Sequence, residues 1–199
     1  LLIVESPAKC KKIEGYLRGF MGNNYKCIAS FGHIRGLTNG LKSIDIQNGF
    51  KPSFSTLSLK HKYINRIKDE IKKCNEVLLA TDDDREGEAI AWHICKACNL
   101  PVSSTKRIIF HEITKPALEK AVLQPTTINM NTVHAQQARQ ILDVLVGFKT
   151  TPVLWSQIVH NTKSKLSAGR CQTPALRLIY DNQKLIDEHP GEKQYQTTG

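Results

Sequence analysis

The chain has 199 residues, with 28 Lys plus Arg against 18 Asp plus Glu and a formal net charge of +10. This charge favours a polyanionic partner such as nucleic acid, bound through a salt-sensitive association. No apolar run has the length of a transmembrane helix, and the six cysteines lack the spacing of a disulfide framework, so membrane-spanning and disulfide-rich secreted classes are disfavoured. We therefore expect an intracellular protein without a membrane partner.

The first part of the chain alternates between strand and helix patterns. Apolar runs of strand length are followed by helical periodicity, and Ser6 and Pro7 are the residue types of a helix cap and first turn. The predicted strands cover 1–4, 25–30, 77–80 and 106–110, and the predicted helices cover 10–20, 59–73, 87–98 and a segment capped by Thr114. This order predicts an α/β fold, doubly wound, with a mostly parallel sheet of about four strands.

The strand pattern ends near residue 127. Helical patterns follow at 133–146, 151–160 and 173–187, so we predict one α/β domain at 1–127 and an incomplete all-α domain at 128–199. The chain begins without Met inside a predicted strand, and residues 193–196 have the pattern of a further element. We expect a chain that is truncated at both ends.

Acidic residues crowd the end of the predicted strand that begins at Val77. The run Asp-Asp-Asp-Arg-Glu at 82–86 follows this strand, at the carboxyl edge where open α/β sheets bind ligands. Two carboxylates about 4 Å apart repel by about 1 kcal/mol in water and several-fold more in a partly buried site. Such a cluster favours a bound cation, and oxygen-only ligands suit Mg²⁺. An isolated acidic loop that only aids solubility is the alternative.

A second strand end supports the cation site. The first predicted strand ends at Glu5, and Lys9 lies one turn into the following helix. If the two strands are parallel neighbours, Glu5 lies beside Asp82 and Asp84, and Lys9 points a positive charge at the same place.

Six sequence blocks resemble the TOPRIM domain and the following region of type IA DNA topoisomerases. They are Ile3–Lys9, Ser30–Leu37, Thr81–His93, Phe110–Lys115, Ala135–Asp143 and Leu166–Leu176. The blocks occur in family order over nearly the whole chain. The Asp-x-Asp-x-Glu pattern is shared with primases and some nucleases, whereas the Ala-Gln-Gln-Ala-Arg and Ser-Ala-Gly-Arg blocks are specific to the topoisomerases.

The resemblance implies ATP-independent, Mg²⁺-dependent cleavage and religation of one DNA strand through a 5′-phosphotyrosine, which relaxes negatively supercoiled DNA. It assigns Glu5 to protonating the departing 3′ oxygen, and Lys9 and Arg85 to stabilising the phosphoryl charge. The implied metal ligands are Glu5, Asp82, Asp84 and Glu86. Alternatively, Glu86 and Glu88 are ordinary acids at a helix start.

The nucleophile is not expected within this sequence. The five tyrosines are Tyr16, Tyr25, Tyr63, Tyr180 and Tyr195, and none has the family's Tyr-x-Arg-Thr-Asp-Ser surroundings. We expect that tyrosine beyond Gly199, so the chain alone should not cleave DNA.

The resemblance also implies residues that contact single-stranded DNA. They are His33, Arg35, Arg139, Gln140, Asp143, Lys149, Trp155, Ser156, Ser167, Gly169, Arg170 and Gln172. Gln140 stands where many relatives carry an arginine. Ordinary alternatives remain: an i,i+4 salt bridge between Arg139 and Asp143, a core role for Trp155, and a simple glycine turn at 167–170.

Two other functions remain open from the sequence. A TOPRIM-containing primase or nuclease would use the acids for polymerisation or hydrolysis, and would have no use for the blocks at 139–172. A DNA-binding module without catalysis is the second alternative. We expect a monomer in the cytoplasm and nucleoid, or in the nucleus or a virus factory if the source is not bacterial.

Overall fold

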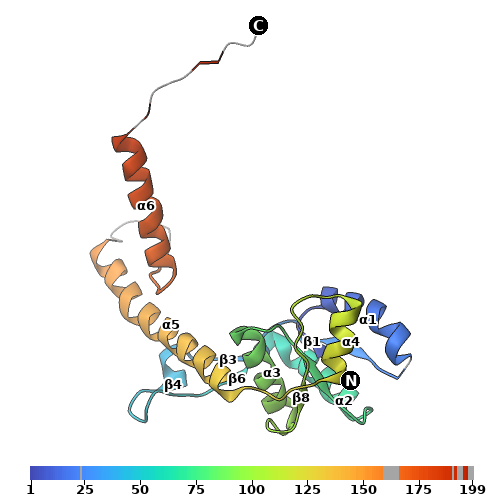
Figure 1. Ribbon diagram of the computed structural model, residues 1–199. Helices are drawn as coiled ribbons and strands as arrows, with labels where there is room; N and C mark the ends of the chain where they lie inside the picture. Colours follow the sequence, from blue (N-terminus) through green and yellow to red (C-terminus); the bar gives the residue numbers. More distant parts are fainter. Residues whose placement is uncertain (23, 159–165, 190, 192–194, 197–199) are drawn as a thin grey trace. The chain divides into compact units, whose positions relative to one another are not determined.

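The computed structural model describes residues 1–22, 24–158, 166–189, 191 and 195–196. The chain divides into two compact units, 1–141 and 142–199, which are described separately (Figure 1). Among the described residues, no helix combines the length and the apolar character that crossing a membrane requires.

A four-stranded parallel sheet forms the centre of the first unit, as predicted. Its strand order is β2 (Cys27–Ala29), β1 (Leu2–Val4), β7 (Leu78–Ala80) and β8 (Lys106–Arg107). Because β1 and β7 are parallel neighbours with Val4 opposite Ala80, both strands deliver the residues that follow them to one edge of the sheet. This register therefore places the candidate site at the edge of the sheet where β1 and β7 end.

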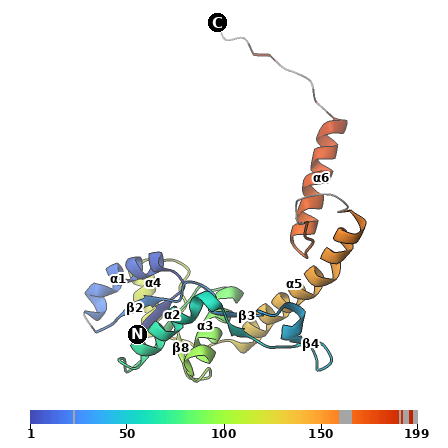
Figure 2. The same cartoon turned by 180° about the vertical axis from the view of Figure 1, so that it is seen from behind.

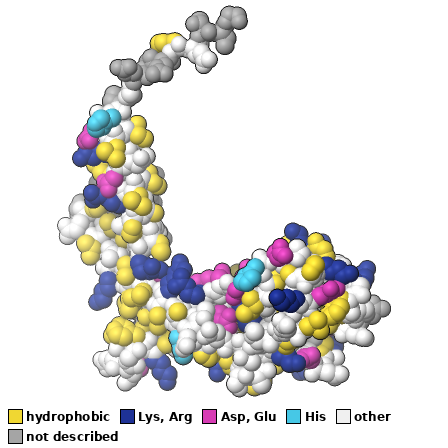
Figure 3. All heavy atoms as spheres, viewed as in Figure 1, with side chains coloured by type: hydrophobic (Ala, Val, Ile, Leu, Met, Phe, Trp, Pro, Cys, Tyr) yellow, Lys and Arg dark blue, Asp and Glu magenta, His cyan; other side chains and the backbone are white. Residues whose placement is uncertain are grey.

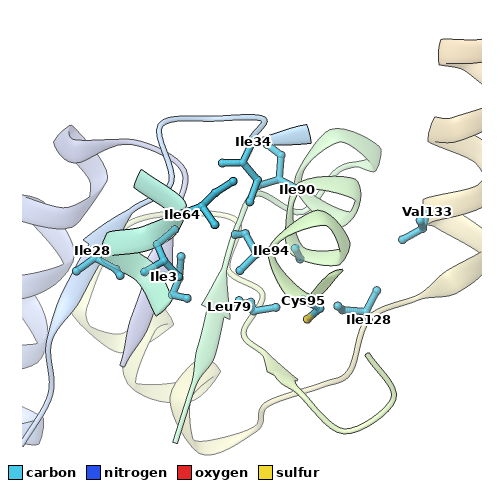
Figure 4. Packing of buried hydrophobic residues seen from close by; sticks show 12 residues of the cluster. Ile3, Ile28, Ile34, Ile64, Leu79, Ile90, Ile94, Cys95, Ile128 and Val133 are labelled. Carbon is cyan, nitrogen blue, oxygen red and sulfur yellow. The ribbon is translucent and has the colours of Figure 1, made fainter. Parts of the chain in front are cut away.

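Helices cover both faces of the sheet. Successive strand residues point to opposite faces, so each strand contributes apolar side chains to both. One face packs on α1 (Pro7–Met21) and α4 (Lys115–Leu123), and the other packs on α2 (His61–Ile71) and α3 (Arg85–Cys98). Figure 4 shows the second cluster, in which Ile3 and Leu79 of the sheet meet Ile64 of α2 and Ile94 of α3. The fold is therefore doubly wound, as expected.

The first helix begins as the cap pattern predicts. The Ser6 side chain accepts a hydrogen bond from the Lys9 amide at 3.4 Å, and Pro7 occupies the first turn. The helix therefore starts three residues before the periodic segment at 10–20 that marked it in the sequence. This start places Lys9 in the first turn, close to the end of β1.

The polar connection expected between the first two helices contains short paired strands. β3 (Arg35–Gly36) pairs with β6 (Ser55–Thr56), and β4 (Ile44–Asp45) pairs with β5 (Lys51–Pro52), both antiparallel. The 3-10 turns η1 (Gly40–Ser43) and η2 (Ser58–Lys60) complete the segment. Strands of two residues leave no detectable period-two pattern, so the sequence did not indicate them.

The predicted break between helices 133–146 and 151–160 is wrong. One helix, α5 (Met130–Gln157), continues through Pro152, and it runs from the first unit into the second (Figure 2). Proline removes one backbone donor without preventing a helix, and the Thr150 hydroxyl donates to the Val146 carbonyl in the turn before it. The predicted end at His160 lies outside the described residues.

The second unit holds the rest of α5 and α6 (Gln172–Glu188). The predicted helix at 173–187 agrees with α6. The domain boundary expected after residue 127 stays a prediction, because α5 crosses the division between the compact units.

Candidate active site

Glu5 and Asp82 meet at the carboxyl edge of the sheet. The Glu5 Oε1 atom accepts a hydrogen bond from the Asp82 amide at 2.9 Å. Lys9 forms an ion pair with Asp82, and its Nζ lies 4.0 Å from Glu5 Oε2. The predicted convergence is thus confirmed for Glu5, Lys9 and Asp82, and the β1–β7 register accounts for it. In the described part of the chain, Asp84 forms no hydrogen bond or ion pair with Glu5 or Lys9, although it lines the same cleft as Lys9 and Asp82.

Asp84 fixes the start of α3. Its Oδ1 atom accepts a hydrogen bond from the Gly87 amide at 2.7 Å, so Asp84 is the N-cap of the helix. A Cβ at Gly87 would lie only 2.1 Å from the Asp82 carbonyl oxygen. The Thr81 hydroxyl donates to the Gly87 carbonyl at 2.7 Å. The acidic loop is therefore folded tightly over the first turn of α3.

An open cleft adjoins this loop. It has a volume of about 350 Å³ and is lined by Lys9, 82–84 and 110–113. His111 Nδ1 lies 3.4 Å from Asp83 Oδ2 at the same cleft. Figure 3 shows acidic side chains gathered near a histidine on this unit, within a surface that is otherwise rich in Lys and Arg. Such a cleft gives a solvent-borne ligand access to the acids.

The Glu86 carboxylate contacts two side chains from other segments. His33 Nε2 lies 3.1 Å from Glu86 Oε2, and Gln136 Nε2 donates to the same oxygen at 3.0 Å. His93, near His33, is buried. This burial lowers the pKa of His93 to about 3, so its ring is neutral. The sequence predicted a role for His33 but missed Gln136, although Gln136 lies inside the Ala-Gln-Gln-Ala-Arg block.

Glu88 is not an exposed acid at a helix start. It is buried, and its Oε2 lies 3.0 Å from an amino group of Arg107, which is also buried. Arg107 donates a second bond to the Asp82 carbonyl at 2.7 Å, and Glu88 accepts from the Asn129 amide at 2.6 Å. Arg107 therefore links Glu88 of α3 to the backbone of the acidic loop at Asp82. The only sequence signal for Arg107 was its place beside Lys106 and before the apolar residues of a predicted strand.

The carboxylates at this edge have the donor chemistry of a hard divalent cation. All their ligand atoms would be oxygens, which Mg²⁺ prefers, and the Lys9 ammonium already occupies a cation position against Asp82. Among the described residues, however, no three His, Cys, Asp or Glu side chains are grouped closely enough to hold a metal. The residues fit the ion in type, and the assignment of each ligand stays a prediction.

Two predicted arginines differ in their surroundings. Arg85 opens α3 and is exposed, with no ion pair to another described residue. Arg35 lies in β3, where it donates to the Phe54 carbonyl at 2.9 Å and stands 5.9 Å from the Trp92 ring centroid. Burial lowers the pKa of Arg35. Arg35 is therefore held by the protein, whereas Arg85 is accessible to a ligand.

In the second unit, residues 166–172 are tied to α5. Arg170 Nε donates to Asp143 at 2.8 Å, and the Trp155 indole N–H donates to the Leu166 carbonyl at 2.7 Å. Trp155 is 49% exposed and so does not fill a core. The Gln172 amide donates to the Ser167 hydroxyl, and a Cβ at Gly169 would crowd Gln172 at 3.3 Å.

The remaining predicted DNA contacts lie on α5. Arg139, Lys149 and Ser156 are exposed, whereas the Gln140 Oε1 atom is buried and has no hydrogen-bond partner among the described residues. Within the same part of the chain, Asp143 pairs with Arg170 and forms no ion pair with Arg139. The DNA-binding roles of all these residues stay predictions.

Comparison with known proteins agrees with this geometry. The Toprim domain family matches residues 1–113, and the DNA topoisomerase family matches residues 127–198. The structure resembles that of full-length topoisomerase I from Thermotoga maritima, with a TM-score of 0.80 and 44% sequence identity. The match covers 94% of this chain and 31% of that one, so this chain spans less than a third of that protein's length. The chain therefore belongs to the Toprim family, which residues 1–113 match, and, through the match at residues 127–198, to the type IA DNA topoisomerases.

Proposed function

We propose that this chain belongs to an enzyme that cuts and rejoins one strand of DNA without ATP and so relaxes negatively supercoiled DNA. The observation that supports it most is the convergence of Glu5, Lys9 and Asp82 at one edge of a Toprim sheet. The match of residues 127–198 to a DNA topoisomerase family favours this reaction over those of other Toprim proteins.

The side chains at the edge suit transfer of a phosphodiester. Glu5, within hydrogen-bonding distance of the acidic loop, would give a proton to the departing 3′ oxygen. Lys9 and Arg85 would stabilise the charge on the phosphoryl oxygens. Asp82, Asp84 and Glu86, with Glu5, would hold Mg²⁺. When bound, this ion would supply positive charge against the phosphate.

The reaction needs a tyrosine nucleophile that we assign to a segment outside these 199 residues, because none of the five tyrosines has the family's surroundings. The chain itself would then bind DNA without cutting it. The residues that would contact the strand come from the segment after β2, from α5 and from the segment that leads into α6, namely His33, Arg35, Arg139, Gln140, Asp143, Lys149, Trp155, Ser156, Ser167, Gly169, Arg170 and Gln172. We place the protein with the DNA of the cell, as a monomer.

Plasmid relaxation by the full-length protein tests this proposal. Relaxation of negatively supercoiled plasmid should require Mg²⁺ and no ATP, and the double change Asp82→Asn with Asp84→Asn should abolish it. Asp69→Asn is the matched control, because Asp69 is an exposed acid of α2 that pairs only with Lys72 among the described residues. The control should relax plasmid at the unaltered rate.

The products separate the alternatives. A strand left with protein linked to its 5′ end supports the topoisomerase. Hydrolysed ends without linked protein would support a nuclease, nucleotide incorporation would support a primase, and binding without any cleavage would support a DNA-binding module. Unchanged relaxation by the double variant would remove the metal assignment.

A further inference from the structure

Phe31 is an exposed aromatic residue beside the candidate site. It follows β2, and the amide of the next residue, Gly32, donates to the Glu5 carbonyl at 3.0 Å. Phe31 has φ +61° and is 37% exposed. The left-handed region is unfavourable for a bulky side chain, and residues held there gather at functional sites. The backbone thus holds this ring at the surface, at the edge that carries Glu5.

A second ring and two lysines accompany Phe31. The ring centroid of Tyr63, on α2, lies 4.3 Å from that of Phe31, with 33° between the planes. The ammonium groups of Lys60 and Lys62 lie 5.6 Å and 5.0 Å from the Tyr63 centroid. Lys60 also donates to the Phe31 carbonyl at 2.5 Å. Four residues from two segments therefore form one cluster of rings and cations.

Packing of the core does not account for this cluster. Neither Phe31 nor Tyr63 is among the buried residues of the two apolar clusters or the apolar side chains packed against them. The neighbouring Ser30 is buried, and its hydroxyl closes the turn by donating to the Gly32 carbonyl at 3.2 Å. The turn therefore holds without a large apolar side chain at position 31.

We propose that Phe31, Tyr63, Lys60 and Lys62 form a stacking platform for one base of single-stranded DNA. The base would stack on the exposed Phe31 ring, and the lysines would contact the flanking phosphates. Aromatic rings interleaved with cations are the usual means of binding single strands without sequence preference, because every base has a π-face. The inference rests on the proposed function, since it needs a DNA strand at the edge that holds Glu5.

Phe31→Leu tests the platform, because leucine keeps an apolar side chain and removes the ring. Binding of the full chain to a fluorescein-labelled single-stranded oligonucleotide is measured by anisotropy. We expect binding to weaken by at least about fivefold, the lower limit for loss of one base stack. Phe31→Tyr keeps a ring and should bind within about twofold of the unaltered chain.

Phe50→Leu is the matched control. Phe50 has φ +60° and is 47% exposed, and no other described ring stacks on it. This control should bind as the unaltered chain does. With 2-aminopurine placed at successive positions of the oligonucleotide, one position should show quenching that disappears in Phe31→Leu and persists in Phe50→Leu.

Lys62→Gln gives an independent test that does not depend on the folding of Phe31→Leu, because Lys62 lies on the exposed face of α2. The slope of log affinity against log salt should become shallower by about 0.7, the value for one phosphate contact on a single strand. If the unaltered chain binds and Phe31→Leu binds equally well, or Lys62→Gln keeps the full slope, the platform is refuted and the proposed function stands. If the unaltered chain does not bind single-stranded DNA, both are refuted.

Discussion

Gly87 is the residue whose substitution should disturb the acidic loop most directly. A Cβ there would lie 2.1 Å from the Asp82 carbonyl oxygen and 2.7 Å from the Asp82 amide nitrogen. Carbon and oxygen approach to about 3.3 Å in the closest favourable contacts, so the loop must move by roughly 1 Å in Gly87→Ala. Both neighbouring atoms belong to the backbone, which cannot turn aside as a side chain can.

The displacement should reduce both stability and activity. Overpacking of this kind costs about 1–3 kcal/mol of the free energy of unfolding. A misplacement of about 1 Å in a catalytic group lowers the rate by about 100-fold. Urea unfolding of the chain measures the first effect, and plasmid relaxation by the full-length protein measures the second.

Gly15→Ala is the control for this substitution. Gly15 lies in α1, and no atom stands within 4 Å of the position its Cβ would take. Alanine should stabilise an exposed helix position by up to about 1 kcal/mol and leave the relaxation rate unchanged. Equal stability and equal relaxation rates for Gly87→Ala and the unaltered protein would refute the tight packing of the acidic loop on α3.

Two further predictions concern buried polar groups. Arg107→Met leaves the Glu88 carboxylate buried without its cationic partner and should lower the free energy of unfolding, measured in urea, by about 3–5 kcal/mol. Adding Glu88→Leu removes the unpaired charge and should recover most of this loss. A double variant as unstable as the single one would contradict the pairing. Burial lowers the His93 pKa to about 3, below the value of about 6.5 for an unfolded chain. The unfolded chain therefore binds the extra proton first, and stability should fall by up to about 1.4 kcal/mol per pH unit as the pH drops from about 6.5 towards 3. His93→Leu should remove one proton from the measured pH slope, and an unchanged slope would show that His93 is not the group responsible.

The strand ends could be predicted from the sequence because two simple signals coincide there. The runs before Glu5 and Asp82 are apolar and short, and charged residues follow each run at once. Parallel pairing of β1 and β7, with Val4 opposite Ala80, then brings both strand ends to one edge, where Glu5 accepts a hydrogen bond from the Asp82 amide. The helix cap at Ser6 was also predictable from a local signal, because a serine followed by proline is typical of a helix start.

Contacts between distant segments gave no such signal. Gln136 reaches Glu86 across 50 residues, and Arg107 lies between Glu88 and the Asp82 carbonyl. No periodicity encodes such pairs, which depend on how α5 and β8 pack near α3. The break predicted between residues 146 and 151 is also wrong, because α5 continues through these residues and through Pro152, a residue that disfavours a helix interior locally.

The central claim is that the acids after β1 and β7 bind a divalent cation, and calorimetric titration of the chain with Mg²⁺ tests it most directly. The unaltered chain should bind Mg²⁺, and Asp82→Asn with Asp84→Asn should lose this binding while its circular dichroism spectrum stays the same. Equal Mg²⁺ binding by the double variant, or no binding by the unaltered chain, would contradict the claim.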